Sequence, residues 1–455
     1  MATQADVIVV GMGPGGEDVA GRLAEAGLTV LGVEAELVGG ECPYWGCIPS
    51  KMIIRAANLL EEGRRIPGMA GASSVQPDWA PVAARIRAEA TDTWDDTVAV
   101  ERFECKGGTL IRGRARLDGP GRVVVGDQEL LATRGVVVST GAHAFVPPIE
   151  GLKDTPYWTN REAIACEEAP ASLLVLGGGA IGVELAQAFS RFGTEVTVIE
   201  AAGSLVIAEE PEAGEALEQA FDAQGITVLT NTSATSVRYE GAAFSVETNT
   251  GATLSAQHLL VAVGRRVDLA TLGVASVGLD PDARALEVDD HLRAVGADRL
   301  WGVGDVTGKG AFTHMSMYQA DIVVNDILGN DVVPAEYRAV PRVTFTDPEI
   351  GSVGLSERQA RAQGIRVRTG STTVSSSARG WIHKVGNEGF IKVVEDADRG
   401  VLVGATSMGP WGGEVLGFLV LAIQAEVPTK TLEHMIYAYP TFHRGIETAV
   451  KDLRA

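Results

Sequence analysis

The sequence predicts an α/β fold with two doubly wound, Rossmann-like domains followed by a C-terminal α+β domain. The first observation is the segment ADVIVVGMGPGGEDVAGRLAEAGLTVLGVE, which runs from an apolar strand through glycines into a helix and ends on Glu34. The second is SLLVLGGGAIGVELAQAFSRFGTEVTVIE, which repeats that order 166 residues later and ends on Glu200. With 455 residues and 45% hydrophobic content, the chain is long enough for about three domains of roughly 150 residues each.

The glycines of both segments have a steric purpose. They allow backbone amides and a helix N-terminus to approach a pyrophosphate, while the terminal acid hydrogen-bonds ribose hydroxyls. A single such segment is weak support, and glycine-rich turns that bind nothing are the alternative. Two copies with matched acids favour two bound dinucleotides. The glycines concerned are Gly11, Gly13 and Gly16 in the first copy and Gly177, Gly179 and Gly182 in the second.

The second copy favours NADH over NADPH. Between Glu200 and Arg238 there is no Lys or Arg, so a ribose 2′-phosphate would meet no nearby cation in that stretch. The acidic side chains there are Glu209, Glu210, Glu212, Glu215, Glu218 and Asp222. A cation from elsewhere in the fold is the alternative.

The motif GGECPYWGCIPSK indicates a redox centre. On an undistorted helix the α-carbons of Cys42 and Cys47 would lie roughly 8 to 9 Å apart, and a disulfide needs less than about 7 Å. A bond between them requires a bend, which Gly46 permits. The helix predicted to follow, with Lys51 one turn on, favours a thiolate at Cys47. Half of a zinc site and two inert thiols are the alternatives, but the chain has no second cysteine pair to complete four ligands, so we expect no metal site.

Later segments complete the predicted organisation. LWGVGDVTGKG is a buried strand ending near Asp305, whose carboxylate is suited to sugar-like hydroxyls or, alternatively, to capping a turn. A helix follows near Phe312 and His314. The stretches VVVSTGAHAFVPPIEG and LLVAVGRRVD are predicted linkers, and a third composition begins near residue 340. We therefore predict domains at 1–150, 151–270, 271–338 and 339–455, the first and third forming one unit.

Composition restricts the partners. The net charge of −21 is unfavourable for nucleic acid and for anionic membranes. The longest apolar run, VLGFLVLAI from Val415 to Ile423, has nine residues and is predicted as a buried helix, since a bilayer span takes about 20. We expect no secretory signal, a cytoplasmic location and small-molecule partners.

With the cysteine motif, both glycine segments and GDV at Asp305 in this order, the chain resembles the class I pyridine nucleotide-disulfide oxidoreductases, the group of dihydrolipoamide dehydrogenase, glutathione reductase and mercuric reductase. The resemblance covers nearly the whole length, and only residues between and just before the cysteines depart from the family motif. It implies FAD on the first glycine segment, NAD on the second, and a C-terminal dimerisation domain. The active form would be a homodimer with a substrate cleft shared between subunits.

The resemblance also implies roles for individual residues. Hydride would pass from the nicotinamide through FAD to a Cys42–Cys47 disulfide, with Cys47 facing the flavin and Cys42 the exposed thiol. Lys51 would lie beside the flavin and pair with Glu184. The implied FAD contacts are Gly11, Gly13, Gly15, Gly16, Glu34, Gly40, Glu41, Lys51, Ala115, Thr140, Gly141, Asp305, Ala311 and His314. The implied NAD contacts are Gly177, Gly179, Ile181, Gly182, Glu200 and Gly264.

The C-terminus departs from the family pattern. Disulfide-reducing members carry HPTxxE, a His with a Glu behind it, whereas this chain reads YPTFHR, with Tyr439 and Arg444 at those positions. A phenol, with a pKa of about 10 against roughly 6.5 for imidazole, is a poor base near neutral pH. His443 and Glu447, spaced i and i+4, are a candidate displaced dyad, and a surface His beside a helix Glu is the alternative.

The acceptor therefore stays open at this point. The first hypothesis is an NADH-dependent flavoenzyme that reduces an unusual low-molecular-weight disulfide. The alternatives are metal-ion reduction of the mercuric reductase kind, carbon–sulfur chemistry of the ketopropyl-coenzyme M kind, quinone or oxygen reduction directly from the flavin, and a non-enzymatic flavin redox sensor.

Overall fold

The computed structural model describes residues 3–454 and divides into two compact units. Unit 1 comprises the described chain up to Ser50, then Ala84–Phe145 and Arg265–Glu336. Unit 2 comprises Lys51–Ala83, Val146–Gly264 and the chain from Tyr337 onward. Helices α3 (Cys47–Arg64) and α4 (Ala80–Arg85) each include residues of both units. The boundaries predicted at residues 150, 270 and 338 stay predictions.

Unit 1 is built on a mainly parallel sheet. Five parallel strands lie in the order β3-β2-β1-β6-β16, and β4 and β5 extend the first half of β6 as an antiparallel meander. The central β1 is apolar and buried from Val7 to Val10, as expected for a strand covered on both faces, whereas Thr3 and Gln4 at its start are exposed. The strands are β1 (Thr3–Val10), β2 (Val30–Glu34), β3 (Thr109–Arg112), β4 (Ala115–Leu117), β5 (Arg122–Val125), β6 (Gln128–Val138) and β16 (Leu300–Gly302).

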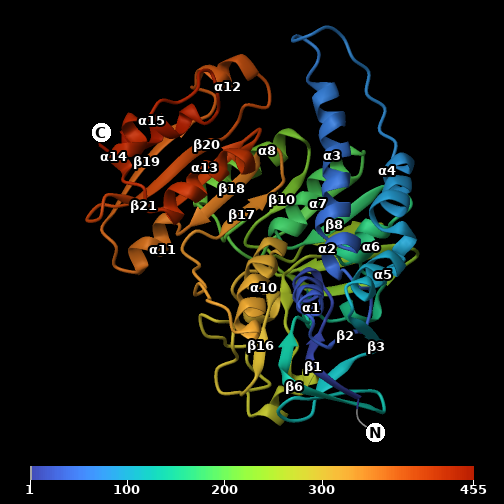
Figure 1. The fold of residues 1–455 in the computed structure, drawn as a ribbon. Coiled ribbons are helices and arrows are strands. Elements are labelled where there is room, and N and C mark those ends of the chain that lie inside the picture. Colours follow the sequence, from blue (N-terminus) through green and yellow to red (C-terminus); the bar gives the residue numbers. More distant parts are fainter. Residues whose placement is uncertain (1–2, 455) are drawn as a thin grey trace. The chain divides into compact units, whose positions relative to one another are not determined.

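Two long helices of unit 1 pack together although they are far apart in sequence. Figure 1 shows α1 (Pro14–Glu25, blue) beside α10 (Thr313–Leu328, gold). Gly13 caps α1 with extended backbone, and Pro14 follows at the first helical position, where its missing N–H costs nothing. The shorter helices are α2 (Glu41–Tyr44), the π-helix η1 (Ile86–Ala90), α5 (Thr97–Cys105) and α9 (Leu269–Leu272).

The two predicted linkers pair with each other at the edge of unit 1. Strands β7 (His143–Ala144) and β15 (Arg265–Arg266) form a two-stranded antiparallel sheet. Both predicted crossover segments are therefore anchored by backbone hydrogen bonds where the chain passes between the units.

Unit 2 repeats the parallel arrangement. Its four-stranded parallel sheet has the order β10-β9-β8-β14, and a three-stranded antiparallel sheet, β11-β12-β13, follows. The elements are α6 (Asn160–Ala165), β8 (Ser172–Leu176), α7 (Ala180–Arg191), β9 (Glu195–Ile199), α8 (Pro211–Ala223), β10 (Thr227–Leu229), β11 (Ala234–Glu240), β12 (Ala243–Thr248), β13 (Thr253–Ala256) and β14 (His258–Val261).

The C-terminal part of unit 2 is an antiparallel sheet in the order β17-β18-β21-β20-β19, with α13 packed on β18 and β21 (Figure 1). Helix α13 contains the run predicted to be buried, but Leu421 is 66% exposed because one face of the helix covers the sheet. Within residues 3–454, no helix combines the length and apolar character needed to cross a bilayer. The elements are β17 (Pro341–Thr344), β18 (Glu349–Gly354), α11 (Glu357–Ala362), β19 (Val367–Thr373), α12 (Ala378–His383), β20 (Phe390–Asp396), β21 (Val401–Gly409), α13 (Gly412–Gln424), α14 (Thr429–His434) and α15 (Arg444–Asp452).

Candidate active site

The first glycine loop joins β1 to α1 in unit 1. Gly11 has φ of +90°, and a Cβ there would collide with the carbonyl of Ser139, the residue after β6. A Cβ on Gly16 would collide with the carbonyl of Gly11. At Gly13, by contrast, a Cβ would meet no described atom within 4 Å. Gly11 and Gly16 therefore lie tightly against neighbouring backbone, whereas the space at Gly13 is open. This open space at the N-terminus of α1, called the Gly13 cradle below, is where a pyrophosphate is favoured.

The second loop, between β8 and α7 in unit 2, has the same construction. Gly177 has φ of +107°, and a Cβ there would collide with the carbonyl of Ala262. Gly182 is equally restricted by the carbonyl of Gly177, while the Cβ position of Gly179 is open. The repeat seen in the sequence is thus a repeat of geometry.

The acid at the end of each second strand reaches back to its loop. Glu34 accepts the backbone N–H of Met12 at 2.7 Å, and Glu200 accepts that of Gly178 at 2.5 Å. Each carboxylate also accepts the N–H of the residue two places further on, at 2.8 and 2.6 Å respectively. Both carboxylates are held beside the cradle, with lone pairs left for ribose hydroxyls.

The other predicted nucleotide contacts lie around the two loops or at strand ends. Gly15 lets α1 approach Val303, and Gly40, with φ of +65°, lets its loop approach Gly13. The remaining residues are Ala115 (buried in β4), Thr140 and Gly141 (after β6), Ala311 and His314 (exposed, at the start of α10), Ile181 (half-buried in α7) and Gly264 (exposed, after β14).

The two motif cysteines lie on different helices. Cys42 is in α2 and Cys47 begins α3, with Trp45 and Gly46 between the helices, so the bend required by the spacing is present. Cys42 is half-buried and Cys47 is exposed in the single chain. The roles expected of the two thiols, Cys47 facing the flavin and Cys42 meeting the substrate, stay predictions.

The N-terminus of α10 is close to Cys47. The Sγ atom of Cys47 lies 3.3 Å from Oγ1 of Thr313, the first residue of α10. The imidazole of His314 stacks on Phe312 at 5.1 Å between ring centres. Cys47 thus has the N-terminus of its own helix and that of α10 near it, and both favour a thiolate.

Asp305 lies just after β16, near two charged side chains of unit 1. Burial raises the pKa of the Asp305 carboxyl above its usual value. The positive charge of Arg265 lowers this pKa, and the negative charge of Glu41 raises it further. Arg265 lies 3.8 Å from Asp305 and 3.5 Å from Glu41. Among the described residues, nothing accepts a hydrogen bond from the enclosed Nε of Arg265. An acceptor-rich ligand would satisfy this donor.

Lys51 and Glu184 meet in unit 2, as the resemblance implied. Their Nζ and Oε2 atoms are 2.7 Å apart, and the Glu184 side chain is 7% exposed. The other carboxylate oxygen accepts the backbone N–H of Phe345 at 2.8 Å, and the Lys51 ammonium lies 4.5 Å from the centre of the Phe345 ring. Two neighbours therefore hold the Glu184 carboxylate, and the ring gives Lys51 a second favourable contact.

The C-terminal segment places Tyr439 at the surface. Its side chain is 70% exposed, and the Arg444 guanidinium lies 5.6 Å from the centre of its ring. Glu447 forms ion pairs with Arg444 at 3.2 Å and Lys451 at 2.8 Å. His443 is exposed and is the residue before α15. The carboxylate predicted to serve His443 is thus held by two cations, and the dyad stays a hypothesis.

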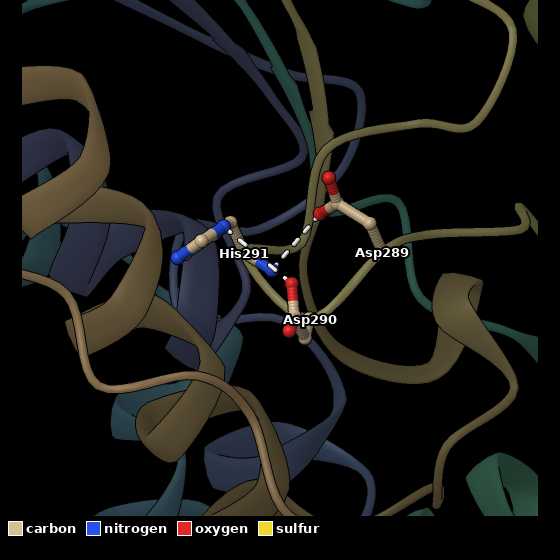
Figure 2. A group of neighbouring side chains, drawn as sticks. All are labelled: Asp289, Asp290 and His291. Atoms are coloured by element: carbon tan, nitrogen blue, oxygen red, sulfur yellow. Dashed lines mark hydrogen bonds and ion pairs between the residues drawn. The ribbon is translucent and has the colours of Figure 1, made fainter.

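A separate cluster of Asp289, Asp290 and His291 (Figure 2) has an architectural explanation. One oxygen of Asp289 accepts the backbone N–H groups of His291 and Arg293, both at 2.9 Å. This carboxylate organises its own turn, and the cluster gives no reason to infer a metal.

Comparison with known proteins identifies the family. The family profile described as pyridine nucleotide-disulphide oxidoreductase matches residues 5–320, and that of its dimerisation domain matches residues 340–450. The chain belongs to this family. Mercuric reductase of Acidithiobacillus ferrooxidans is 32% identical over 454 residues, covering 98% of this chain and 82% of the relative. Dihydrolipoyl dehydrogenase of Chlorobaculum tepidum is 32% identical over 463 residues, covering 99% and 97%.

Solved structures agree with this assignment. LpdA from Mycobacterium tuberculosis matches with a TM-score of 0.86 at 26% identity, covering 100% of both chains. The Cu(II) complex of the HOCl-induced flavoprotein disulfide reductase RclA from Escherichia coli matches with a TM-score of 0.85 at 26% identity, covering 97% of this chain and 98% of that one. The predicted fold class and family resemblance are confirmed.

As a pyridine nucleotide-disulphide oxidoreductase, the chain is an enzyme of a family that uses FAD and a pyridine nucleotide. The open cradles at Gly13 and Gly179 and the enclosed Nε of Arg265 fit such ligands. Sequence reasoning missed Thr313, Phe345 and Arg265, because each acts through a contact with a residue distant in sequence.

Proposed function

We propose that this enzyme oxidises NADH, uses the electrons to reduce a Cys42–Cys47 disulfide, and passes them to a small acceptor, a low-molecular-weight disulfide. The observation that carries the proposal is the setting of Cys47. It begins one helix, α3, and its sulfur lies 3.3 Å from the first residue of a second, α10. Two helix N-termini stabilise a thiolate, which is the form that performs disulfide exchange.

The thiol chemistry balances with these two cysteines alone. The Cys42 thiolate attacks one sulfur of the acceptor disulfide, which forms a mixed disulfide and releases the first acceptor thiol. The Cys47 thiolate then attacks the Cys42 sulfur, which releases the second thiol and restores the protein disulfide. Two electrons reach the acceptor, and solvent supplies its protons.

The two glycine loops divide the cofactors between them. FAD and NADH, when bound, supply the hydride chemistry that reduces the disulfide. In unit 1, the Gly13 cradle, Glu34, Arg265 and Asp305 would hold FAD. In unit 2, the Gly179 cradle and Glu200 would hold the nicotinamide dinucleotide, and the lack of Lys and Arg between Glu200 and Arg238 supports NADH.

Lys51 and Glu184 would form an ion pair that stabilises negative charge during electron transfer from the nicotinamide to the cysteines. Glu184 keeps the Lys51 ammonium in place at 2.7 Å, one helical turn after Cys47 on α3. A fixed cation there favours both a thiolate and negative charge on a reduced ring.

The acceptor would be reduced in a homodimer that lacks the His-Glu acid/base pair of the disulfide-reducing family members. The match of residues 340–450 to the dimerisation domain supports the homodimer. Tyr439 is exposed, and its phenol would donate a hydrogen bond to an acceptor rather than take a proton from a thiol. A reducing compartment such as the cytoplasm is consistent with a thiol pair that cycles between its two states.

Reduction of a soft metal ion is the second candidate. Tyr439 in place of a base favours it, because a soft cation bound by two thiolates requires no proton transfer. Mercuric reductase of Acidithiobacillus ferrooxidans at 32% identity and the Cu(II) complex of RclA support testing it.

Anaerobic titration of the holoenzyme with NADH tests the relay. We expect two newly alkylated cysteines, Cys42 and Cys47, for each NADH consumed, and a long-wavelength absorption band from the Cys47 thiolate. The Cys47→Ser enzyme should lack the band, and the Cys42→Ser enzyme should show it before any NADH is added. Consumption of NADH without new thiols would exclude the disulfide relay.

Steady-state assays identify the acceptor. Small disulfides and Hg²⁺ or Cu²⁺ are compared as acceptors in wild type and in Cys42→Ser. Full activity of Cys42→Ser with a quinone would instead place the acceptor reaction at the flavin.

A further inference from the structure

Trp45, which stands between the two motif cysteines, stacks on a tryptophan from a distant segment. The rings of Trp45 and Trp94 lie 5.2 Å apart between centres at an angle of 21°. Trp45 follows α2, which holds Cys42, and is separated by Gly46 alone from Cys47. The stack therefore lies at the break between the two cysteine-bearing helices.

Trp94 is presented by backbone in an unfavourable conformation. Asp92, Thr93 and Trp94 have φ of +46°, +58° and +57°, three consecutive left-handed residues with no glycine among them. Such residues persist where the surrounding structure imposes them, commonly at functional sites. The single turn of π-helix η1 lies immediately upstream, another feature enriched at such sites.

Both ends of this strained segment are anchored within unit 1. The buried hydroxyl of Thr91 donates to the carbonyl of Ile86 at 3.1 Å. On the other side, the carboxylate of Asp96 accepts the backbone N–H of Val38 at 2.6 Å and a hydrogen bond from Arg112 at 2.5 Å. Val38 lies in the loop that leads into the cysteine motif, so the segment is fastened to the chain that it contacts.

The indole of Trp94 is held by ring contacts. Its Nε1 is enclosed and has no hydrogen-bond acceptor among residues 3–454. The contacts that position the ring are the stack on Trp45 and the Arg87 guanidinium, 5.7 Å from the ring centre. A buried donor without an acceptor is unfavourable. The left-handed backbone and the unpaired Nε1 of Trp94 are therefore two unfavourable features that accompany the stack on Trp45.

We propose that Trp94 is a positioning residue for the cysteine pair, and that its stack on Trp45 sets how readily Cys42 and Cys47 form their disulfide. The inference rests on the proposed function. The stack fixes the break between α2 and α3 and so holds the two thiols near each other before they join. Forming the disulfide then costs less conformational entropy. Without it, the disulfide is less favoured relative to the dithiol.

The size of the effect follows from the strength of a stacked aromatic pair, which is worth up to about a tenfold change in an equilibrium constant. For a two-electron couple, a tenfold change corresponds to about 30 mV. We therefore expect Trp94→Leu to shift the couple to a more positive potential by up to about 30 mV.

The test measures the thiol–disulfide equilibrium of the holoenzyme directly. The protein is equilibrated anaerobically with buffers of reduced and oxidised dithiothreitol, trapped with an alkylating agent, and scored by mass at the peptides of Cys42 and Cys47. In this exchange dithiothreitol gives two electrons and two protons as it closes to its cyclic disulfide, and the protein disulfide takes them up as two thiols. Flavin content and thermal unfolding verify that each variant is folded.

Four variants separate the possibilities. Trp94→Phe keeps a ring in place and should stay within about twofold of wild type. Trp94→Leu and Trp45→Leu should each shift the equilibrium up to about tenfold, and the double variant should shift no further than either single change, because both remove one contact. If Trp94→Leu does not fold, Trp45→Leu carries the test.

Each outcome has one interpretation. An equilibrium in Trp94→Leu or Trp45→Leu equal to wild type overturns the inference, and so do shifts that add in the double variant. A wild-type protein whose Cys42 and Cys47 never form a disulfide overturns the proposed function instead.

Discussion

Removal of the Thr313 hydroxyl should weaken the thiolate of Cys47. Thr313→Val keeps the shape of the side chain and the N-terminus of α10 but removes the oxygen that lies 3.3 Å from Sγ. When Cys47 is ionised the hydroxyl donates to it, and a donor to the charged form lowers a pKa. The variant should therefore raise the pKa of Cys47.

The magnitude follows from that one hydrogen bond. A hydrogen bond contributes about 1 kcal/mol net, and one pKa unit corresponds to about 1.4 kcal/mol. Sulfur is a weak acceptor, so the value for an ordinary hydrogen bond applies rather than the larger one for charged groups. We expect the apparent pKa of Cys47 to rise by roughly 0.7 unit.

The assay is the pH dependence of Cys47 alkylation in a Cys42→Ser background, where the second motif thiol is absent. Peptide masses separate Cys47 from the exposed Cys105. Thr313→Ser is the matched control, because it keeps the hydroxyl and should retain the wild-type profile. An unchanged profile in Thr313→Val, or an equal shift in Thr313→Ser, would refute the reasoning.

Three further predictions concern unit 2. Lys51→Met leaves the buried Glu184 carboxylate without its cation and should lower the free energy of unfolding by about 2 kcal/mol, less than for a fully buried pair because the Lys51 side chain is 35% exposed. Glu184→Gln should lower it by less, and equal losses in urea unfolding would contradict this interpretation. Wild type should have a higher kcat/KM with NADH than with NADPH. Ala201→Arg places a cation at an exposed position next to Glu200 and should raise kcat/KM with NADPH by about tenfold. A wild-type preference for NADPH would show that another part of the fold supplies a cation to the ribose phosphate. Arg191, whose side chain is 2% exposed, lies 2.6 Å from Asp347, and Arg191→Met should lower the thermal midpoint by roughly 4 °C, whereas an unchanged midpoint would mean that the pair contributes little.

The nucleotide loops illustrate what a sequence can predict. Gly11 and Gly177 have left-handed backbone, and Glu34 and Glu200 fold back to the same loop position. These constraints act within about 25 residues and depend on backbone sterics that only glycine satisfies. They are therefore visible as spacing alone, without knowledge of the rest of the fold.

The cysteine motif marks the limit of that reasoning. Its spacing indicated a break between Cys42 and Cys47, which the structure has, but it did not indicate what lies beside either thiol. The environment of a thiol depends on what packs around it, and Thr313, which lies beside Cys47, is 266 residues away in sequence. No local pattern specifies such a neighbour.

The sequence by itself determined the family, the two nucleotide loops and the redox motif, because each depends on residues close together along the chain. Only the tertiary structure decided what surrounds those residues. It brought Thr313 to Cys47, Phe345 to the Lys51–Glu184 pair and Trp94 to Trp45. These contacts join distant segments, and they form because the sheets of each unit enclose apolar strands and thereby fix where the intervening helices begin.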